Sequence, residues 1–262
     1  MTPWHTGPLC ALDFETTGVD VEESRIVTAC IARIDGTGQA PTVGRTWLVN
    51  PGVEIPASAA GIHGVTTARA RAEGVEPVGA LAEIVDMLAR ALETGAPIVG
   101  FNIRRYDLPL LMWECRRHGL PTLEQALGRP IGPVIDARVL DKQVSRRSGK
   151  RKLVNCCEFW NVGLDAASAH DASADAWGAA GVAVRIAQKN AAIGRMSADE
   201  LHDAQAGWAR AQDADFARWL RGKAMRARTS DEQLDSIRDA EHLEATAGEW
   251  PLIVSPRQES LS

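Results

Sequence analysis

Apolar runs separated by short polar turns fill the first fifty residues, a pattern typical of β-strands. Apolar stretches at 8–14, 25–34 and 43–49 each predict a strand, and Asp35-Gly36 supplies a turn after the second. Strands joined by such short connections pair antiparallel. We therefore expect the chain to begin with a three-stranded antiparallel meander.

From residue 78 onward, apolar residues recur at steps of three and four, which predicts helices. Short apolar strands interrupt this pattern at 97–101 and 133–135. The predicted helices cover 78–92, 108–118 (with Pro109 tolerated in its first turn), 137–144, 152–159 and 171–190. Because three strands come first and strands then alternate with helices, the sequence predicts an α/β fold with a mixed five-stranded sheet flanked by helices.

The composition changes near Gly194, where Ser197 and Glu200 have the spacing of a capping box. It predicts a long helix with one face that carries Leu201, Ala204, Trp208, Ala211, Phe216 and Trp219. We interpret the tryptophans as core packing or a self-association surface. A second helix starts at Ser230 and ends by Gly248, before an apolar tail at 250–253 and nine final residues expected to be disordered. The predicted division is a domain over 1–194 and a helical appendage over 195–262.

Nothing in the sequence predicts a membrane or secreted protein. The apolar runs are far shorter than the ~18 residues of a membrane span, and the N-terminus lacks the basic and apolar regions of a secretory signal. The cysteines number five, an odd count without zinc-site spacing, which favours buried thiols in a reducing compartment. We expect a cytoplasmic protein that has no membrane partner and no bound zinc.

The net charge of −5 means that a polyanionic partner must be met by local positive charge. One basic run contains Lys142, Arg146, Arg147, Lys150, Arg151 and Lys152. It predicts a mobile loop that follows phosphates with salt-sensitive affinity. A second run over 218–228 is interpreted as a solvated helix end, where basic residues suit the helix dipole.

Carboxylates stand at three junctions where chemistry is plausible. Asp13 and Glu15 lie two apart on a predicted strand and so face the same side, where they either bind a hard cation or are solvated in a turn. Asp107 precedes a predicted helix and, taken alone, is best explained as a helix-capping acid. Asp175 lies in the predicted helix over 171–190, with His170 just outside it. Such a histidine can exchange a proton near neutral pH.

Together these segments resemble the DEDDh (DnaQ-like) 3′→5′ exonuclease superfamily, in order and in spacing. The resemblance covers about 9–190. Its motifs are Asp-x-Glu-Thr-Thr-Gly at 13–18, an Ile-His-Gly-Val-Thr loop at 62–66, Asn102 followed by Tyr106-Asp107, and His170-x4-Asp175. The chain departs from many relatives at Phe101, where they have histidine, and at Arg104-Arg105, where they often have small residues.

The resemblance implies an RNase H-like sheet and a catalytic site with two divalent ions, Mg²⁺ or Mn²⁺. The implied metal ligands, also catalytic, are Asp13, Glu15, Asp107 and Asp175, and Asp13 would bridge both ions. His170 would be the general base. The terminal nucleotide would lie near Thr16, Thr17, Gly18, His63, Asn102 and Tyr106. The Tyr106 ring either stacks on a base or is a half-buried aromatic in a helix's first turn.

The implied substrate is the 3′ end of single-stranded or frayed DNA, in proofreading or repair. RNA would be cut by the same chemistry, and the sequence does not decide between them. From another class, a non-catalytic nucleic-acid-binding or polymerase-interaction module on the same fold remains open. Residues 233–237 are similar to peptides by which polymerase accessories bind sliding clamps, although such pentapeptides also occur by chance. A DNA polymerase or sliding clamp is therefore a candidate partner.

Overall fold

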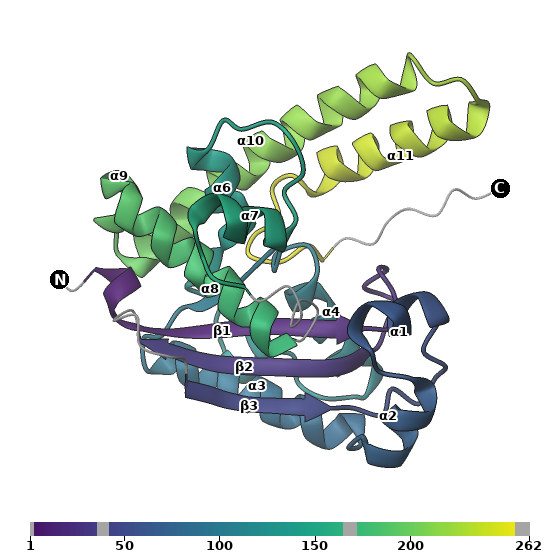
Figure 1. The fold of residues 1–262 in the computed structure, drawn as a ribbon, viewed down its shortest axis with the longest axis vertical. Coiled ribbons are helices and arrows are strands. Elements are labelled where there is room, and N and C mark those ends of the chain that lie inside the picture. The colour runs from purple at the N-terminus through teal and green to yellow at the C-terminus, as the bar shows by residue number, and fades with distance from the viewer. Residues whose placement is uncertain (1–2, 36–41, 165–171, 255–262) are drawn as a thin grey trace.

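The computed structural model describes residues 3–35, 42–164 and 172–254. Its centre is a five-stranded sheet in the order β3-β2-β1-β4-β5 (Figure 1). The strands are β1 (Pro8–Thr16), β2 (Ile26–Asp35), β3 (Thr42–Leu48), β4 (Ile98–Gly100) and β5 (Val134–Asp136). The first three pair antiparallel, and β4 and β5 join β1 in parallel. The predicted meander and mixed sheet are confirmed. Gly36 of the predicted turn, His170 and residues 255–262 of the predicted disordered tail lie outside the described residues.

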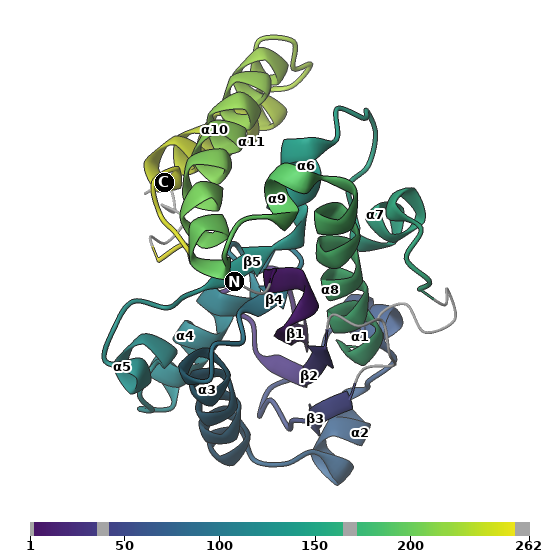
Figure 2. The ribbon, with the colours of Figure 1, turned by 90° about the vertical axis from the view of Figure 1, so that its left-hand side faces the viewer.

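Helices cover both faces of the sheet because β1 is apolar on both sides. Leu12 and Phe14 point into a core shared with α3 (Pro77–Glu93) and α4 (Asp107–Arg117). Leu9 and Ala11 point into the opposite core, built with α6 (Ala137–Val144), α7 (Leu153–Trp160) and α8 (Ala172–Lys189). Figure 2 shows α3 and α8 on opposite faces of the sheet. The odd-numbered positions of β1, including Asp13 and Glu15, therefore share the α8 side.

Four short helices fall where the sequence predicts none. They are α1 (Ala57–His63), α2 (Thr67–Glu73), α5 (Leu123–Leu127) and α9 (Ala191–Gly194). Each has at most two turns, too few for an apolar period to be recognised. Side-chain caps at Thr66, Thr122 and Asn190 begin three of them. No helix in the described part of the chain is long and apolar enough to cross a bilayer, and all five cysteines are buried, free thiols, as predicted.

The C-terminal region forms a helical hairpin of α10 (Ala198–Ala224) and α11 (Ser230–Thr246), which extends away from the sheet (Figure 1). Core packing, one of the two interpretations of this face, is wrong at the far end of α10, because Phe216 and Trp219 are 45% and 54% exposed. The alternative of a self-association surface stays a prediction. The face that is buried carries Leu201, Gln205, Ala209, Asp213, Ala217, Leu220 and Ala224. Two polar residues on this face explain why the apolar pattern pointed elsewhere.

Those polar residues have specific partners, and Gln205 covers the open edge of β5. Its side-chain oxygen accepts the Asp136 N–H at 2.9 Å, and its amide nitrogen donates to the Val134 carbonyl at 3.1 Å. One turn earlier, His202 Nδ1 accepts the Val134 N–H at 2.9 Å. Unpaired edge groups invite association with other strands. The first half of α10 therefore completes the hydrogen bonding of the sheet.

Candidate active site

Three carboxylates meet beside the C-terminal end of β1. Asp13 and Glu15 project from β1 toward α8, and Asp175 lies in the first turn of that helix. One carboxylate oxygen of each lies within 4.8 Å of the others. Leu9 and Ala11 are packed beneath α8 farther back along the strand. The helix thus begins where the strand changes from apolar to acidic residues, which leaves the three carboxylates in a partly exposed group.

Asp107 approaches the same strand from the other side. It begins α4 and is 3% exposed, and its Oδ1 accepts the Phe14 N–H at 3.1 Å. Since β4 ends at Gly100, the Asp107 carboxylate takes up a backbone donor of β1 beyond the paired part of the two strands. It is also one of the charges that raise the pKa of Asp13. Tyr106 is the N-cap residue of α4, so Asp107 is an acid of the first turn whose carboxylate is held by the backbone of β1.

Burial and mutual repulsion both act against ionisation here. Burial raises the pKa of Asp13 well above its usual range, and the charges of Asp107, Asp175 and Glu15 raise it further. Burial likewise raises the pKa of Asp107 to about 8, although the Phe14 N–H opposes the shift. A partly buried, all-oxygen group of like charges is stabilised by hard divalent cations. The donor set therefore fits Mg²⁺ or Mn²⁺.

Tyr106 joins the first two motifs to each other. Its hydroxyl hydrogen-bonds Thr16 Oγ1 and donates to the Gly18 carbonyl, so it bridges the turn after β1. The ring is half-buried against the core, and burial raises the pKa of the phenol to about 12. Thr17 closes the same turn, where its Oγ1 accepts the Arg25 N–H at 2.9 Å. The predicted nucleotide-binding residues of this turn are thus held rigidly beside the carboxylates.

His63 lies at the turn between α1 and α2. Gly64 adopts a left-handed conformation with φ 73°, which ends α1, and His63 Nδ1 accepts the Val65 N–H at 3.2 Å. Val65 packs with Val27 of β2, next to Thr28, which pairs with Glu15. The Ile-His-Gly-Val-Thr loop is therefore anchored at the same end of the sheet as the acidic group.

The loop from Gly100 to Tyr106 depends on Asp136, a buried residue that the sequence analysis missed. Its carboxylate accepts the N–H groups of Asn102 at 3.0 Å and of Arg138 at 2.9 Å. Asn102 has φ 64°, and its Oδ1 accepts from the Arg138 guanidinium at 2.8 Å. Asp136 directly follows the predicted strand over 133–135 and directly precedes the predicted helix over 137–144. Asp107 likewise directly precedes a predicted helix, and this shared position was the available signal.

Arg104 and Arg105, the departures in the second motif, attach this loop to the hairpin. The buried Arg104 guanidinium pairs with Asp213 of α10 at 2.8 Å and donates to the carbonyls of Thr246 and Glu249. Arg105 pairs with the other Asp213 oxygen at 2.6 Å. The hairpin is thereby fixed to a loop that carries Asn102 and Tyr106.

The expectation of a freely mobile basic loop after α6 needs correction. Arg147 and Arg151 both form ion pairs with Asp141, which is fully buried and also accepts the Trp160 indole N–H at 2.8 Å. These arginines fold the loop onto α6 and α7. Arg146, Lys150 and Lys152 are exposed, so only part of the predicted basic run faces solvent.

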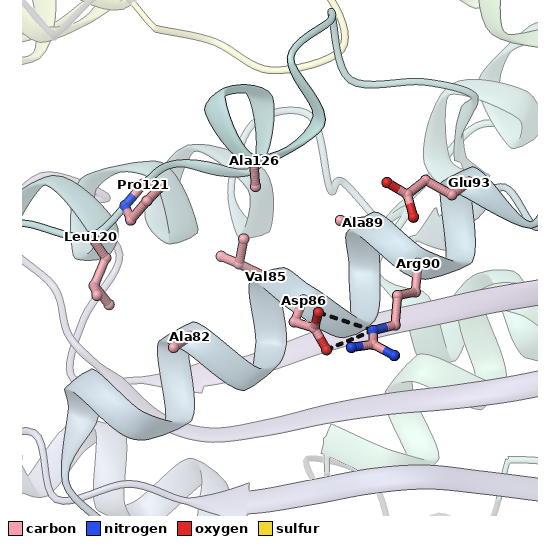
Figure 3. A pocket seen from close by; sticks show the side chains of 9 residues that line it. All are labelled: Ala82, Val85, Asp86, Ala89, Arg90, Glu93, Leu120, Pro121 and Ala126. Atoms are coloured by element: carbon pink, nitrogen blue, oxygen red, sulfur yellow. Dashed lines mark hydrogen bonds and ion pairs between the residues drawn. The ribbon is translucent and has the colours of Figure 1, made fainter.

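A separate pocket of about 500 Å³ lies between α3 and the segment around α5 (Figure 3). Ala82, Val85 and Ala89 form its apolar wall, and the ion pair of Asp86 and Arg90 lies beside it. None of the predicted site residues lines this pocket. The acidic group beside β1 is therefore the better candidate for chemistry.

The mixed sheet, with four carboxylates around the end of its central strand, is the arrangement that the resemblance leads us to expect. Residues 10–182 match the family model RNase_T, described as Exonuclease, and the chain belongs to this family. The match confirms the resemblance to the DEDDh superfamily. No curated protein matches the chain.

Solved structures show the same fold. E. coli exonuclease I in complex with a dT13 oligonucleotide is 18% identical, with a TM-score of 0.54 over 68% of this chain and 40% of that one. The zinc-bound E. coli exonuclease I–ssDNA complex is 18% identical, with a TM-score of 0.57 over 71% and 42%. Exonuclease I from Methylocaldum szegediense is 18% identical, with a TM-score of 0.57 over 81% and 45%. The chain thus spans less than half the length of these proteins, and the predicted RNase H-like fold is confirmed.

Proposed function

We propose that this protein is a divalent-metal-dependent 3′→5′ exonuclease that removes nucleotides from single-stranded or frayed DNA, in proofreading or repair. The observation that carries the proposal is the meeting of Asp13, Glu15 and Asp175 within 4.8 Å, with Asp107 at their side. Family membership and the likeness to structures of exonuclease I with single-stranded DNA support it. A polymerase or sliding clamp as partner remains a weaker part of the proposal, because residues 233–237 lie within α11.

The four carboxylates would hold two Mg²⁺ or Mn²⁺ ions. When bound, such a pair of ions stabilises charge on the attacking and leaving oxygens of a phosphodiester and lowers the pKa of a water. The Phe14 N–H fixes the Asp107 oxygen, and the Tyr106 hydroxyl fixes the turn at Thr16 and Gly18. Both contacts prearrange the site before substrate arrives. His170, outside the described residues, would take the proton from the attacking water.

RNA is the second candidate substrate, because the matching family model is named RNase_T. The test is a ladder assay on 5′-labelled and 3′-labelled oligonucleotides of DNA and of RNA, with Mg²⁺ or with chelator. We expect stepwise loss from the 3′ end with Mg²⁺ only. The preferred polymer then identifies the substrate.

Two variants and one control make this assay decisive. Asp13→Ala and His170→Ala are expected to abolish the ladder. Asp86→Ala removes an exposed carboxylate of α3 that pairs with Arg90 and lines the separate pocket, and it should leave the ladder intact. Equal cleavage by wild type and Asp13→Ala would refute the proposed function.

A further inference from the structure

A second pocket borders the loop that carries Asn102, and its lining is rich in positive charge. Four basic residues and two acidic ones line it: Arg104, Arg105, Arg138, Lys142, Asp136 and Asp213. The pocket itself encloses about 20 Å³, room for about one water, so a larger group binds at its mouth. The pocket adjoins the acidic group because Arg105 lines it, and the next residue, Tyr106, hydrogen-bonds Thr16 of β1. A cationic pocket next to an acidic group that fits divalent cations is complementary in charge to the phosphodiester backbone of a nucleic acid.

The positive charge in the pocket exceeds what its carboxylates neutralise. Asp213 already pairs with both Arg104 and Arg105, at 2.8 and 2.6 Å. Burial and then the charge of Arg138 lower the pKa of Lys142 to about 8. Cations that lower one another's pKa are stabilised by an added anion. A phosphate group has the charge and the acceptor oxygens for this.

Exposed aromatic rings continue from the pocket along α10. The Lys142 ammonium lies 5.9 Å from the centre of the Phe216 ring, and Phe216 stacks on Trp219 with centroids 5.5 Å apart and an interplanar angle of 13°. Both rings are about half exposed. At ~1.5 Å per helical residue, Trp219 lies about 9 Å beyond Asp213 along the helix. The rings therefore extend the pocket away from the sheet.

We propose that Arg105, Arg138, Lys142, Phe216 and Trp219 form a binding strip for the single strand upstream of the 3′ end. This inference rests on the proposed function and adds where the rest of the strand is held. A backbone phosphate binds at the mouth of the cationic pocket, where Arg105 and Lys142 are partly exposed, and unpaired bases stack on Phe216 and Trp219. Alternating cations and exposed rings bind single strands without sequence preference, because every base has a stacking face. Duplex DNA keeps its bases stacked inside and fits this strip poorly.

The test compares strand lengths. Under the proposal, Phe216→Leu/Trp219→Leu raises KM for a fifteen-nucleotide oligo(dT) about tenfold or more, relative to KM for a trinucleotide, because the short strand reaches the pocket before it reaches Trp219. Leucine keeps the apolar volume and loses the stacking face. The control is Trp113→Leu, which removes another ring paired with a cation, Arg116, on α4. We expect it to leave the length dependence unchanged.

A binding measurement separates this inference from the proposed function. Fluorescence anisotropy of the labelled fifteen-nucleotide strand in chelator requires no hydrolysis. There the double variant should lose about tenfold in affinity, and Lys142→Gln should reduce the slope of log Kd against log salt by about 0.7. If the wild-type protein cuts no strand but binds the fifteen-nucleotide strand, and the double variant binds it more weakly, only the proposed nuclease activity is refuted. If the variants are active and their KM and Kd for the long strand equal those of wild type, the binding strip is refuted and the proposed nuclease activity is not.

Discussion

Asp141 of α6 and the acidic group around Asp13 both lie on the α8 side of the sheet, and the surroundings of their carboxylates are opposite. Asp141 is surrounded by donors: Arg147, Arg151 and the Trp160 indole, which is 2.8 Å away. Burial alone would raise the pKa of Asp141, but the Trp160 and Arg151 hydrogen bonds and the two arginine charges together lower it. At Asp13 burial acts with three neighbouring carboxylates, and the pKa is raised well above its usual range.

The difference separates a structural carboxylate from one suited to chemistry. Asp141 is ionised and neutralised by the chain's own cations, so it joins α6, α7 and the loop between them. Ionisation of Asp13 and Asp107 costs free energy in the folded protein. That free energy becomes smaller when a cation from outside the chain binds between the carboxylates. Strongly perturbed carboxylates that share a cleft are typical of functional sites. Matched substitutions at the two groups should therefore act on different properties.

The largest effect is expected at Asp13. Under the proposed function, Asp13→Asn lowers kcat/KM by about a thousandfold or more, because it removes several kcal/mol of transition-state stabilisation. Its free energy of unfolding in chelator should equal or exceed that of wild type, since one repelling charge is lost. Single-turnover kinetics and urea unfolding measure the two quantities. If Asp13→Asn stays active or is clearly less stable than wild type, Asp13 does not differ from Asp141 in the way proposed.

The same substitution at Asp141 should act on stability. Asp141→Asn leaves Arg147 and Arg151 without their carboxylate, and breaking a buried ion pair costs about 3–5 kcal/mol. Urea unfolding should show a loss near the lower end of this range, because both arginine side chains keep 15–16% exposure. The exposed pair of Asp86 and Arg90 provides the control, and Asp86→Asn should change stability by less than about 1 kcal/mol. Equal losses in the two variants would contradict this account of Asp141.

A neutral hydrogen-bonding side chain, Gln205, should contribute less to the free energy of unfolding than the ion pairs of Asp141. Gln205→Leu leaves the Asp136 N–H and the Val134 carbonyl at the β5 edge without their side-chain partner. Leaving buried backbone groups unsatisfied costs about 1–3 kcal/mol. Gln188→Leu, at an exposed glutamine of α8, should change the free energy of unfolding by at most about 0.5 kcal/mol. A silent Gln205→Leu would mean that α10 does not stabilise the sheet edge.

The sequence predicted the acidic group better than the partners of Asp141 for a physical reason. Asp13 and Glu15 share a face through the two-residue period of a strand, so local pattern places them together. Asp107 and Asp175 stand where helices begin, and the family resemblance, not the local pattern, adds them to the group. The pairing of Asp141 with Arg147 and Arg151 depends on how an irregular loop folds back, which no period encodes. Apolar spacing does not identify the face of α10 that is buried, because that face carries Gln205 and Asp213, which are polar residues with specific partners.

The pH dependence of stability tests the raised pKa directly. Asp107 shifts from an ordinary value of 3.8 to about 8, so its ionisation opposes folding between these values. In chelator the free energy of unfolding should therefore fall as pH rises from 5 to 8. Asp107→Asn, which keeps an acceptor for the Phe14 N–H, should reduce that fall by an amount on the order of 3 kcal/mol. Added Mg²⁺ should reduce it in wild type, since cations favour the ionised carboxylates. Superimposable pH profiles of wild type and variant in chelator would show that Asp107 is ionised as easily as Asp141, and the contrast between the two groups would then rest on Asp13 alone.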